Sequence, residues 1–199
     1  MTGKLNKYVD LQPQKKGNAI IAIAASGPDS VVPYIMETIL LALSQAKETI
    51  RICTPYFIPP EELTSTLVIA AANGINVELI LPSKSDSFIV QHASFSFIKP
   101  LLQRGIKVYF YEKGFMHSKT IVIDGSLAFI GTMNMDTRSF YLNFEITSLI
   151  HDRDLCQALE DSFELDKQES QLVTMEQWQG RSVLHRGLDS VCRLMSALL

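Results

Sequence analysis

Short apolar runs alternate with longer segments of helical periodicity through the first half of the chain. A short apolar run that ends at a turn signal is typical of a buried strand, and the first run ends at Gly27-Pro28. They predict strands over 19–26, 49–57, 76–82 and 107–112. Between them, apolar residues recur at steps of three and four, the spacing of one helix face. These segments predict helices over 31–46, 60–72 and 86–103.

Strands that alternate with helices predict βαβ units, in which helices cover a sheet. Two later segments add antiparallel strands to this sheet: a hairpin over 115–134 and a strand over 141–152. An acidic segment over 152–169 predicts a solvated helix that follows the core. The sequence therefore predicts an α/β fold with a mixed β-sheet flanked by helices on both faces.

The two ends of the chain differ from the central domain, which is expected over 19–170. Residues 1–18 are polar and predict a flexible lead-in, and residues 171–199 predict a C-terminal amphipathic tail, whose last stretch from Trp178 onward is expected to form a helix. The apolar stripe of this tail consists of Leu184, Leu188, Val191, Met195 and Leu198, and its basic residues are Arg181, Arg186 and Arg193. Such a helix either lies in a membrane interface or docks on its own domain, and the pattern favours neither.

Composition limits the classes of function. The chain carries 18 Lys and Arg against 21 Asp and Glu, so no general basic field attracts nucleic acid. We therefore expect no nucleic-acid partner, and any phosphate must bind through a few local groups. The three cysteines lack the spacing of a zinc site, which predicts no structural metal. No apolar run reaches the roughly 18 to 20 residues of a membrane span.

The hairpin carries the candidate chemistry. Residues two apart in a strand share a face, so His117 and Lys119 are expected to point the same way. A two-residue type I′ turn at Asp124-Gly125 would place His117 opposite Thr132. Thr132 and Asn134 would then lie on the face of His117. A four-residue loop would keep this parity, whereas a one-residue bulge would send the two sets to opposite faces.

These side chains suit one phosphate group. Lys119 would supply positive charge to its non-bridging oxygens, and Thr132 and Asn134 would supply neutral hydrogen bonds. His117 can act as nucleophile or as general acid near neutral pH. Glu145, an acid within an apolar strand, is predicted to accept a hydrogen bond from His117 and to orient its ring.

Each of these residues also has a purely structural explanation. A single His on a strand is commonly an edge residue, and a Lys two residues away commonly protects the edge against aggregation. Turn chemistry alone explains Asp124, and Glu145 can pair with a remote Arg. No structural explanation covers the whole set, which favours a site where Gly131 lets a ligand approach the backbone.

The spacing of these residues resembles that of a known family. His117-x-Lys119, Asp124 and Gly131-Thr132-x-Asn134 fill every position of HxKxxxxDxxxxxxG[ST]xN, the HKD signature of the phospholipase D superfamily. Three further segments resemble the carboxy-terminal half of bacterial cardiolipin synthases, and the likeness extends over roughly 19–199. These segments are TPYFIPPEEL (54–63), ILPSKSDS (80–87) and NMDTRSFYLNFEIT (134–147).

The resemblance implies a phospholipase D-like αβα sandwich and a phosphatidyltransferase that joins two phosphatidylglycerol molecules, releasing glycerol and leaving cardiolipin. Family members use two HKD motifs, with neither metal nor organic cofactor. One His attacks the phosphodiester to give a phosphohistidine, and the other protonates the leaving alcohol. Family usage favours proton donation by the His of the second motif, here His117. The resemblance makes His117, Lys119 and Asp124 the catalytic motif, with Asp124 in a structural role outside the phosphate shell.

The sequence departs from the family pattern in the number of motifs. One HKD motif is found where a cardiolipin synthase has two, because His92 and His151 lack a following Lys at the required position and His185 lies in the tail. The sequence is therefore interpreted as half of a site, completed by a second HKD half from another chain or by a homodimer partner.

The expected partners are a phospholipid substrate, phosphatidylglycerol, and a membrane surface. The protein is expected to be peripheral to the cytoplasmic membrane of a bacterium. Two alternatives remain: a homodimeric phospholipase D-like phosphodiesterase or nuclease, and a catalytically incomplete fragment.

Overall fold

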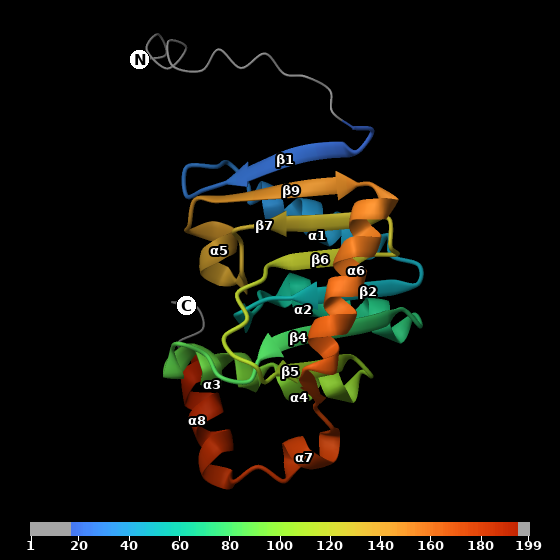
Figure 1. Cartoon of the computed structure of the whole chain (residues 1–199). Coiled ribbons are helices and arrows are strands. Elements are labelled where there is room, and N and C mark those ends of the chain that lie inside the picture. The colour runs from blue at the N-terminus through green and yellow to red at the C-terminus, as the bar shows by residue number, and fades with distance from the viewer. Residues whose placement is uncertain (1–16, 195–199) are drawn as a thin grey trace.

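Eight strands form one mixed sheet in the order β1-β9-β7-β6-β2-β4-β5-β10 (Figure 1). The computed structural model describes residues 17–194. The strands of the sheet are β1 (Ile20–Ser26), β2 (Thr49–Cys53), β4 (Asn76–Pro82), β5 (Lys107–Tyr111), β6 (Thr120–Ile123), β7 (Leu127–Gly131), β9 (Glu145–His151) and β10 (Ser170–Leu172). A separate parallel pair consists of β3 (Phe57–Ile58) and β8 (Met135–Asp136).

The sheet has a parallel part and an antiparallel part that meet at β6. β2, β4 and β5 are parallel neighbours. β6 pairs antiparallel with β2 on one side and with β7 on the other. β7, β9 and β1 continue the antiparallel part to one edge, and β10 closes the other edge against β5. The mixed sheet predicted from the sequence is confirmed.

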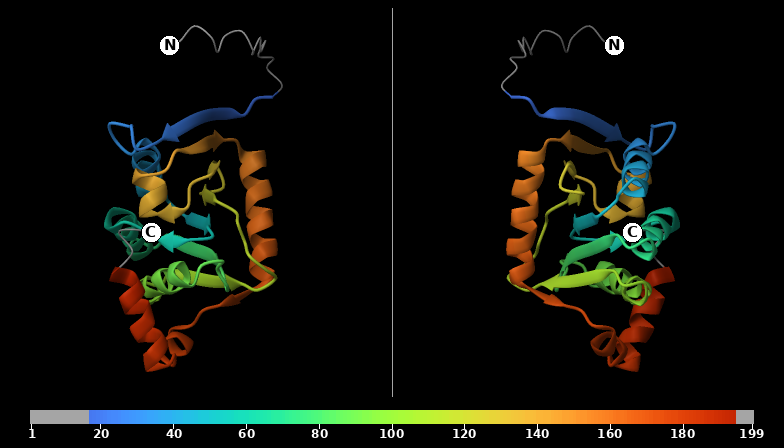
Figure 2. Two further views of the ribbon diagram at one scale, coloured as in Figure 1. Left: turned by 90° about the vertical axis from the view of Figure 1, so that its left-hand side faces the viewer. Right: turned by 90° about the vertical axis from the view of Figure 1, so that its right-hand side faces the viewer.

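Helices cover both faces of the sheet, which confirms the predicted αβα arrangement. Seen along the sheet edge, α6 lies alone on one face, and α1, α2, α3 and α8 lie on the other side (Figure 2). The helices are α1 (Tyr34–Ser44), α2 (Glu61–Ala72), α3 (Phe88–Ser96), α4 (Ile98–Gln103), α5 (Thr137–Tyr141), α6 (Arg153–Gln168), α7 (Met175–Gln179) and α8 (Val183–Leu194). The main core lies between the sheet and the side that carries α1 to α4.

Three predicted elements have different bounds in the structure. The strand expected over 49–57 breaks into β2 and β3 around Pro55, whose missing N–H cannot join a ladder. The helix expected over 86–103 breaks into α3 and α4, so that Pro100 lies in the first turn of α4, where a proline is tolerated. The strand expected over 141–152 begins only at Glu145, because α5 extends to Tyr141.

The tail forms an ordered part of the fold as far as it is described. The division into three segments stays a prediction, and β10 lies across the boundary proposed at residue 170. α8 contacts α3 through Asp189, which lies 2.7 Å from His92. Most of the predicted lead-in, and Met195 and Leu198 of the predicted stripe, lie outside the described residues. Among residues 17–194, no helix has both the length and the apolar character needed to cross a membrane.

Glu78 is a buried charge, 1% exposed, between the sheet and α6. Its carboxylate accepts hydrogen bonds from Lys167 at 2.8 Å and from the Tyr109 hydroxyl at 3.0 Å. Arg51 lies 3.6 Å from the same carboxylate and pairs with Glu160 of α6 at 2.9 Å. Burial raises the pKa of Glu78, but the contacts with Lys167 and Tyr109 outweigh it, and the net pKa is lowered. These ionic contacts hold α6 against the sheet.

We expect Glu78→Gln to lower the free energy of unfolding by about 3 kcal/mol, because Lys167 and Arg51 would lose their shared counter-charge. Urea unfolding at neutral pH measures this loss. Because the pKa of Glu78 is lowered on folding, the difference from the native protein should narrow as the pH falls through the folded-state pKa. The control is Glu169→Gln at the exposed pair with Lys113, which should leave the urea midpoint unchanged. Equal losses of stability in the two variants would contradict the role of Glu78 in holding α6 against the sheet.

Candidate active site

The hairpin turn forms as predicted, but the strands that follow it have a different register. Asp124 and Gly125 both have positive φ, 51° and 56°, as a type I′ turn requires. The N–H of Ser126 donates to the carbonyl of Ile123 at 3.1 Å, which closes the turn. Ser126 is nevertheless a third residue of the loop, because Ile123 pairs with Leu127. The predicted pairing of Ile123 with Ser126 is wrong by one residue.

Because of this one-residue shift, the strand pairing no longer provides the reason to expect Thr132 and Asn134 on the face of His117. β7 ends at Gly131, whose N–H donates to the carbonyl of Lys119 at 3.4 Å. In this register a continued ladder would place Thr132 opposite Ser118, but β6 begins only at Thr120, so the expectation that Thr132 and Asn134 share the face of His117 stays a prediction. The site residues lie beyond the ends of the ladder, so tertiary contacts decide where they point.

Asp124 ties the hairpin to the segment that enters β2. Its Oδ1 accepts the N–H groups of Glu48 and Thr49 at 2.8 and 2.9 Å, and its Oδ2 accepts that of Lys47 at 2.9 Å. Burial raises the pKa of Asp124, but the three amides outweigh it, and the net pKa is lowered. Asp124 thus makes structural contacts at the opposite end of β6 from His117, and its part in catalysis stays a prediction.

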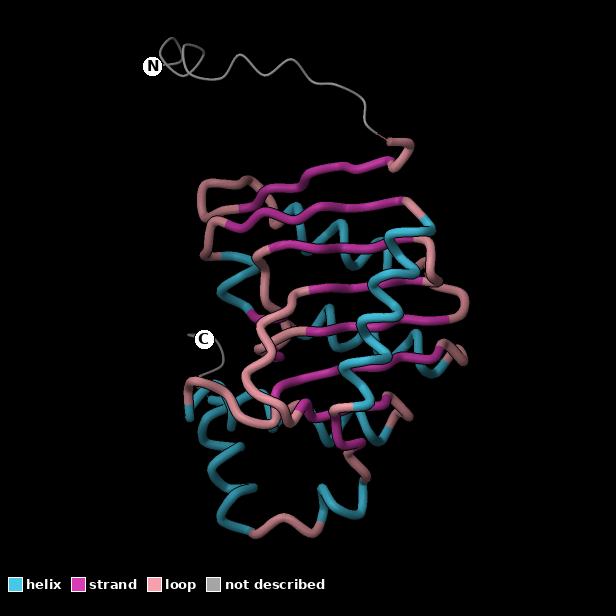
Figure 3. Tube along the Cα trace, in the orientation of Figure 1, coloured by secondary structure: helices cyan, strands magenta, loops and turns pink. Residues whose placement is uncertain are grey.

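A loop joins β5 to β6 (Figure 3). His117 and Lys119 come at its end, directly before β6, and their side chains are in contact. Lys119 Nζ lies 3.3 Å from Nδ1 and 3.2 Å from Nε2 of His117, and it donates to the His117 carbonyl at 3.2 Å. Burial lowers the pKa of Lys119, and Glu145 and Asp136 raise it in part. The structure therefore brings an imidazole and an ammonium group together where β2 ends, beside Thr120.

A buried carboxylate that was not predicted as a site residue, Asp136, lies near this pair. It is 5% exposed and caps α5 by accepting the N–H of Ser139 at 2.7 Å. Burial raises the pKa of Asp136, and Ser139 and Asn134 oppose this rise in part. Asn134 Oδ1 is itself buried, with no hydrogen-bond partner in the part of the chain that is described. The sequence signal for Asp136 is the helix-capping pattern Asp-x-x-Ser.

Glu145 contacts Thr132 and Asn143. The Thr132 hydroxyl donates to one carboxylate oxygen of Glu145, and Asn143 Nδ2 donates to the other at 3.4 Å. The predicted hydrogen bond from His117 to Glu145 is absent among residues 17–194, where the His117 ring contacts Lys119 instead. Glu145 still acts on Lys119 electrostatically. The structure therefore joins Thr132 to the His117–Lys119 pair through Glu145.

Gly131 is required by the packing of β7 against β9. A Cβ at this position would collide with the carbonyl oxygen of Ile146 and with Thr147 of the neighbouring strand. The absence of a side chain at Gly131 is thus explained without the ligand approach that the sequence suggested.

Aromatic side chains border His117. The ring centroid of Phe115 lies 5.6 Å from that of His117 and 6.2 Å from that of Tyr56. The Tyr56 hydroxyl donates to Asp86 at 2.7 Å, and burial together with Asp86 raises the pKa of Tyr56 to about 12. Sequence reasoning did not single out these neighbours, although their segments contributed to the family resemblance. In the described range, no three His, Cys, Asp or Glu side chains are placed to hold a metal ion.

Comparison with known proteins identifies sequence relatives. A family model described as "Cardiolipin synthase, PLD-like domain" matches residues 39–167. A cardiolipin synthase of Halalkalibacterium halodurans is 41% identical over 184 residues, which are 92% of this chain and 37% of that protein. Cardiolipin synthase 1 of Bacillus anthracis is 42% identical over 90% of this chain and 35% of its own length. The chain thus spans little more than a third of the length of these curated relatives.

Solved structures share the fold at low sequence identity. A phosphatidylserine synthase of Haemophilus influenzae superposes with a TM-score of 0.74 at 16% identity, over 91% of this chain and 48% of that chain. A phospholipase D family member, Nuc of Salmonella typhimurium, superposes with a TM-score of 0.67 at 18% identity, over 79% of this chain and 99% of that chain. At these identities the likeness concerns the αβα sandwich.

We expect Asp124→Asn to lower the free energy of unfolding by about 2 kcal/mol, because the carboxamide would turn a donor toward one of the three backbone amides. Asn tolerates positive φ, so the substitution tests the carboxylate and leaves the turn unstrained. Urea unfolding from pH 7 downward is the measurement. Because the pKa of Asp124 is lowered on folding, the loss should be full at pH 7 and shrink as the pH falls through the folded-state pKa. A loss that does not vary with pH would rule out this account.

Proposed function

Because the chain belongs to the family of cardiolipin synthase phospholipase D-like domains, we propose that it supplies half of an active site that transfers a phosphatidyl group between phosphatidylglycerol molecules. The observation that carries the proposal is the contact of the Lys119 ammonium with the His117 imidazole, 3.2 Å from Nε2. A cation and a proton-transferring group at this distance can act on the same phosphodiester.

The proposed reaction uses two imidazoles. The imidazole of the other half attacks phosphorus, forming an N–P bond and breaking the P–O bond to glycerol, whose oxygen takes a proton from His117. A hydroxyl of the second phosphatidylglycerol then returns a proton to His117 and attacks the phosphohistidine. This step breaks the N–P bond and forms cardiolipin. Lys119 offsets the charge that develops on the non-bridging oxygens.

The neighbouring polar groups support phosphate binding. Thr132 is exposed, and its hydroxyl is held by Glu145. Asn134 Oδ1 is one of the buried polar atoms without a hydrogen-bond partner in the described chain, and the Asn134 side chain acts on Asp136. We propose that Thr132 and Asn134 bind the phosphate region and that Glu145 positions Thr132.

Apolar side chains near the site favour a lipid over a nucleic acid. Phe115 beside His117 is 41% exposed, and Phe144 and Ile146, which flank Glu145, are 74% and 51% exposed. Nucleic-acid sites combine such aromatics with a basic groove, whereas this chain has a net charge of −3. The acyl region of a phospholipid is the chemistry that suits an exposed apolar border.

A second half is needed because the chain carries one HKD motif. We propose that a second HKD half, from another chain or from a longer parent chain, brings the other imidazole to His117. The protein would then work at the surface of a bacterial cytoplasmic membrane, where its lipid substrate lies.

With a complementary first half supplied, His117→Asn should abolish cardiolipin formation on phosphatidylglycerol vesicles, because the variant cannot transfer a proton. Lys119→Ala should lower the rate on the order of 10²-fold, by analogy with the loss of one oxyanion donor. Thin-layer chromatography of the labelled lipid measures both, and circular dichroism checks that each variant is folded.

Matched controls separate these effects from a general loss of His or Lys. His151→Asn removes an exposed imidazole at the far end of β9, and Lys113→Ala removes an exposed ammonium paired with Glu169. Both should keep the native rate. Near-native turnover by His117→Asn would refute the catalytic assignment.

The competing proposal is a homodimeric phosphodiesterase or nuclease, in which two copies of this chain supply the two motifs. It predicts a dimer in solution by light scattering and cleavage of DNA without an added half. We expect instead no DNA cleavage, and cardiolipin only after the complementary half is added. Cleavage of DNA that His117→Asn abolishes would favour the competing proposal.

A further inference from the structure

Helix α8 rests on α3 through polar contacts. Asp189 of α8 is 5% exposed and lies 2.7 Å from His92 of α3 and 2.7 Å from Arg181. The other buried residue of the helix is Cys192. A helix that docks on its own domain normally turns its apolar stripe inward. α8 differs, because its most buried residue is the charged, hydrogen-bonded Asp189, which faces the domain together with Cys192.

Several apolar side chains of α8 turn outward, whereas Leu188 is half-buried. Leu184, Val191 and Leu194 are 73%, 60% and 85% exposed. Their spacings of seven and three residues place them on one face, which we call the α8 stripe. An exposed stripe on a docked helix is costly in water, so it points to an apolar medium or partner outside the domain.

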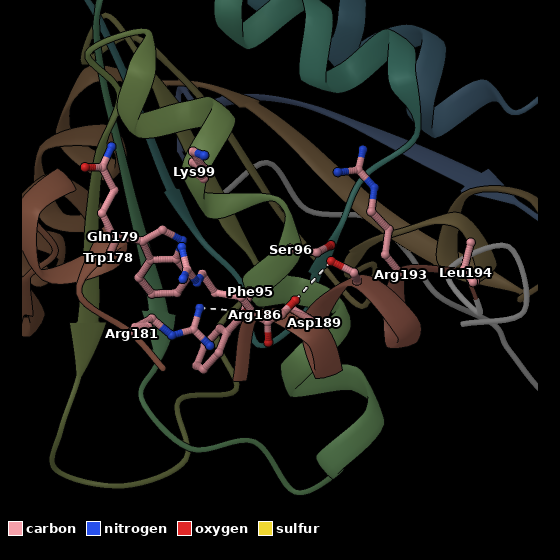
Figure 4. A pocket seen from close by; sticks show the side chains of 11 residues that line it. Phe95, Ser96, Lys99, Trp178, Gln179, Arg181, Arg186, Asp189, Arg193 and Leu194 are labelled. Carbon is pink, nitrogen blue, oxygen red and sulfur yellow. Dashed lines mark hydrogen bonds and ion pairs between the residues drawn. The ribbon is translucent and has the colours of Figure 1, made fainter. Parts of the chain in front are cut away.

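A basic pocket adjoins this helix. It has a volume of about 600 Å³ and is formed by side chains of α3, α4, α7 and α8 (Figure 4). Lys99, Arg186 and Arg193 line it, and none of them forms an ion pair with a carboxylate among residues 17–194. The carboxylate in the lining, Asp189, is already paired with Arg181. The pocket thus concentrates positive charge on a chain that is negative overall.

Aromatic rings hold two of the guanidinium groups in place. Arg181 lies 4.1 Å above the ring of Trp178, and Arg193 lies 4.7 Å above that of Phe97. Stacking restricts the guanidinium plane. Arg181 is paired with Asp189, whereas Arg193 has no carboxylate partner among residues 17–194, and its edge can donate to the oxygens of a phosphate. Arg186 and Ser190 lie one helical turn apart on the same side of α8 and belong to the same lining.

We propose that this pocket binds the phosphate of an anionic phospholipid while the α8 stripe enters the lipid surface beside it. A lipid surface accounts for both features at once, because it presents anionic phosphate next to an apolar phase. α8 and α5, whose cap is Asp136 near the site, both lie toward the same strand ends, α5 beside β7 and α8 nearer the β5–β10 edge (Figures 1 and 2). Binding here would hold the membrane on the side of the strand ends where His117 lies. Because it would not use His117 or Lys119, the inference does not depend on the proposed reaction.

Trp178 reports on this pocket because it is the one tryptophan of the chain and lines the cavity. Its fluorescence should change on titration with phosphatidylglycerol vesicles and stay constant with phosphatidylcholine vesicles. Lys99→Gln with Arg186→Gln should weaken co-sedimentation with phosphatidylglycerol vesicles about 25-fold, since each basic group near an anionic surface contributes roughly a factor of five. Leu184→Ser with Val191→Ser should weaken it as well.

The matched control is Arg104→Gln with Arg153→Gln, which removes two exposed cations that line no part of the pocket. It should keep vesicle binding within about twofold. Circular dichroism checks the fold of every variant. Equal losses in the pocket pair and the control pair would overturn the proposal.

Two other outcomes would also overturn it. A Trp178 response to inorganic phosphate or glycerol 3-phosphate, with none to phosphatidylglycerol vesicles, would identify a soluble anion as the ligand. A dimer that the α8 stripe variant dissociates, with vesicle binding unaffected, would identify a second copy of the chain as the occupant.

Discussion

The three amide hydrogen bonds accepted by Asp124 fix the strand that positions the site. They hold the tip of the hairpin at Lys47–Thr49, where the chain enters β2. β6 has four residues and lies between β2 and β7, so it joins the parallel part of the sheet to the antiparallel part. With one end of β6 held in this way, the other end sets Lys119 beside the end of β2. His117 then follows from the loop that leads into the strand.

Charged side chains gather at three places in the fold, and they have a different role at each place. Glu78 is shared by cations beneath α6, where it holds the helix on the sheet. Asp136 and Glu145 surround Lys119 without pairing with it within 4.0 Å, so the ammonium stays available to an anion. The basic pocket beside α8 holds cations in excess of its carboxylate. Net charge argued against nucleic acid, but only the local distribution indicates where phosphates can bind.

The secondary-structure elements and the candidate site residues could largely be predicted from the sequence. Periodicity is a local property, so strands and helices were placed close to their observed bounds, except where Pro55 and Pro100 divide them and where β9 begins only at Glu145, after α5. The turn at Asp124 was also local, because Asp-Gly favours positive φ. Asp136 was missed because its role needs burial and a neighbour, Lys119, that lies far away along the chain. The contacts of Glu145 were mispredicted for the same reason.

The sequence by itself determined the element types, the turn and the family, because periodicity and motif spacing depend on neighbours along the chain. Only the tertiary structure decided the register, since the third loop residue, Ser126, reverses the face of everything that follows it in a strand. It also decided that the α8 stripe points outward, although the pattern of the helix is amphipathic. An amphipathic pattern shows that a helix has two faces, whereas the contacts of Asp189 determine which face meets the domain.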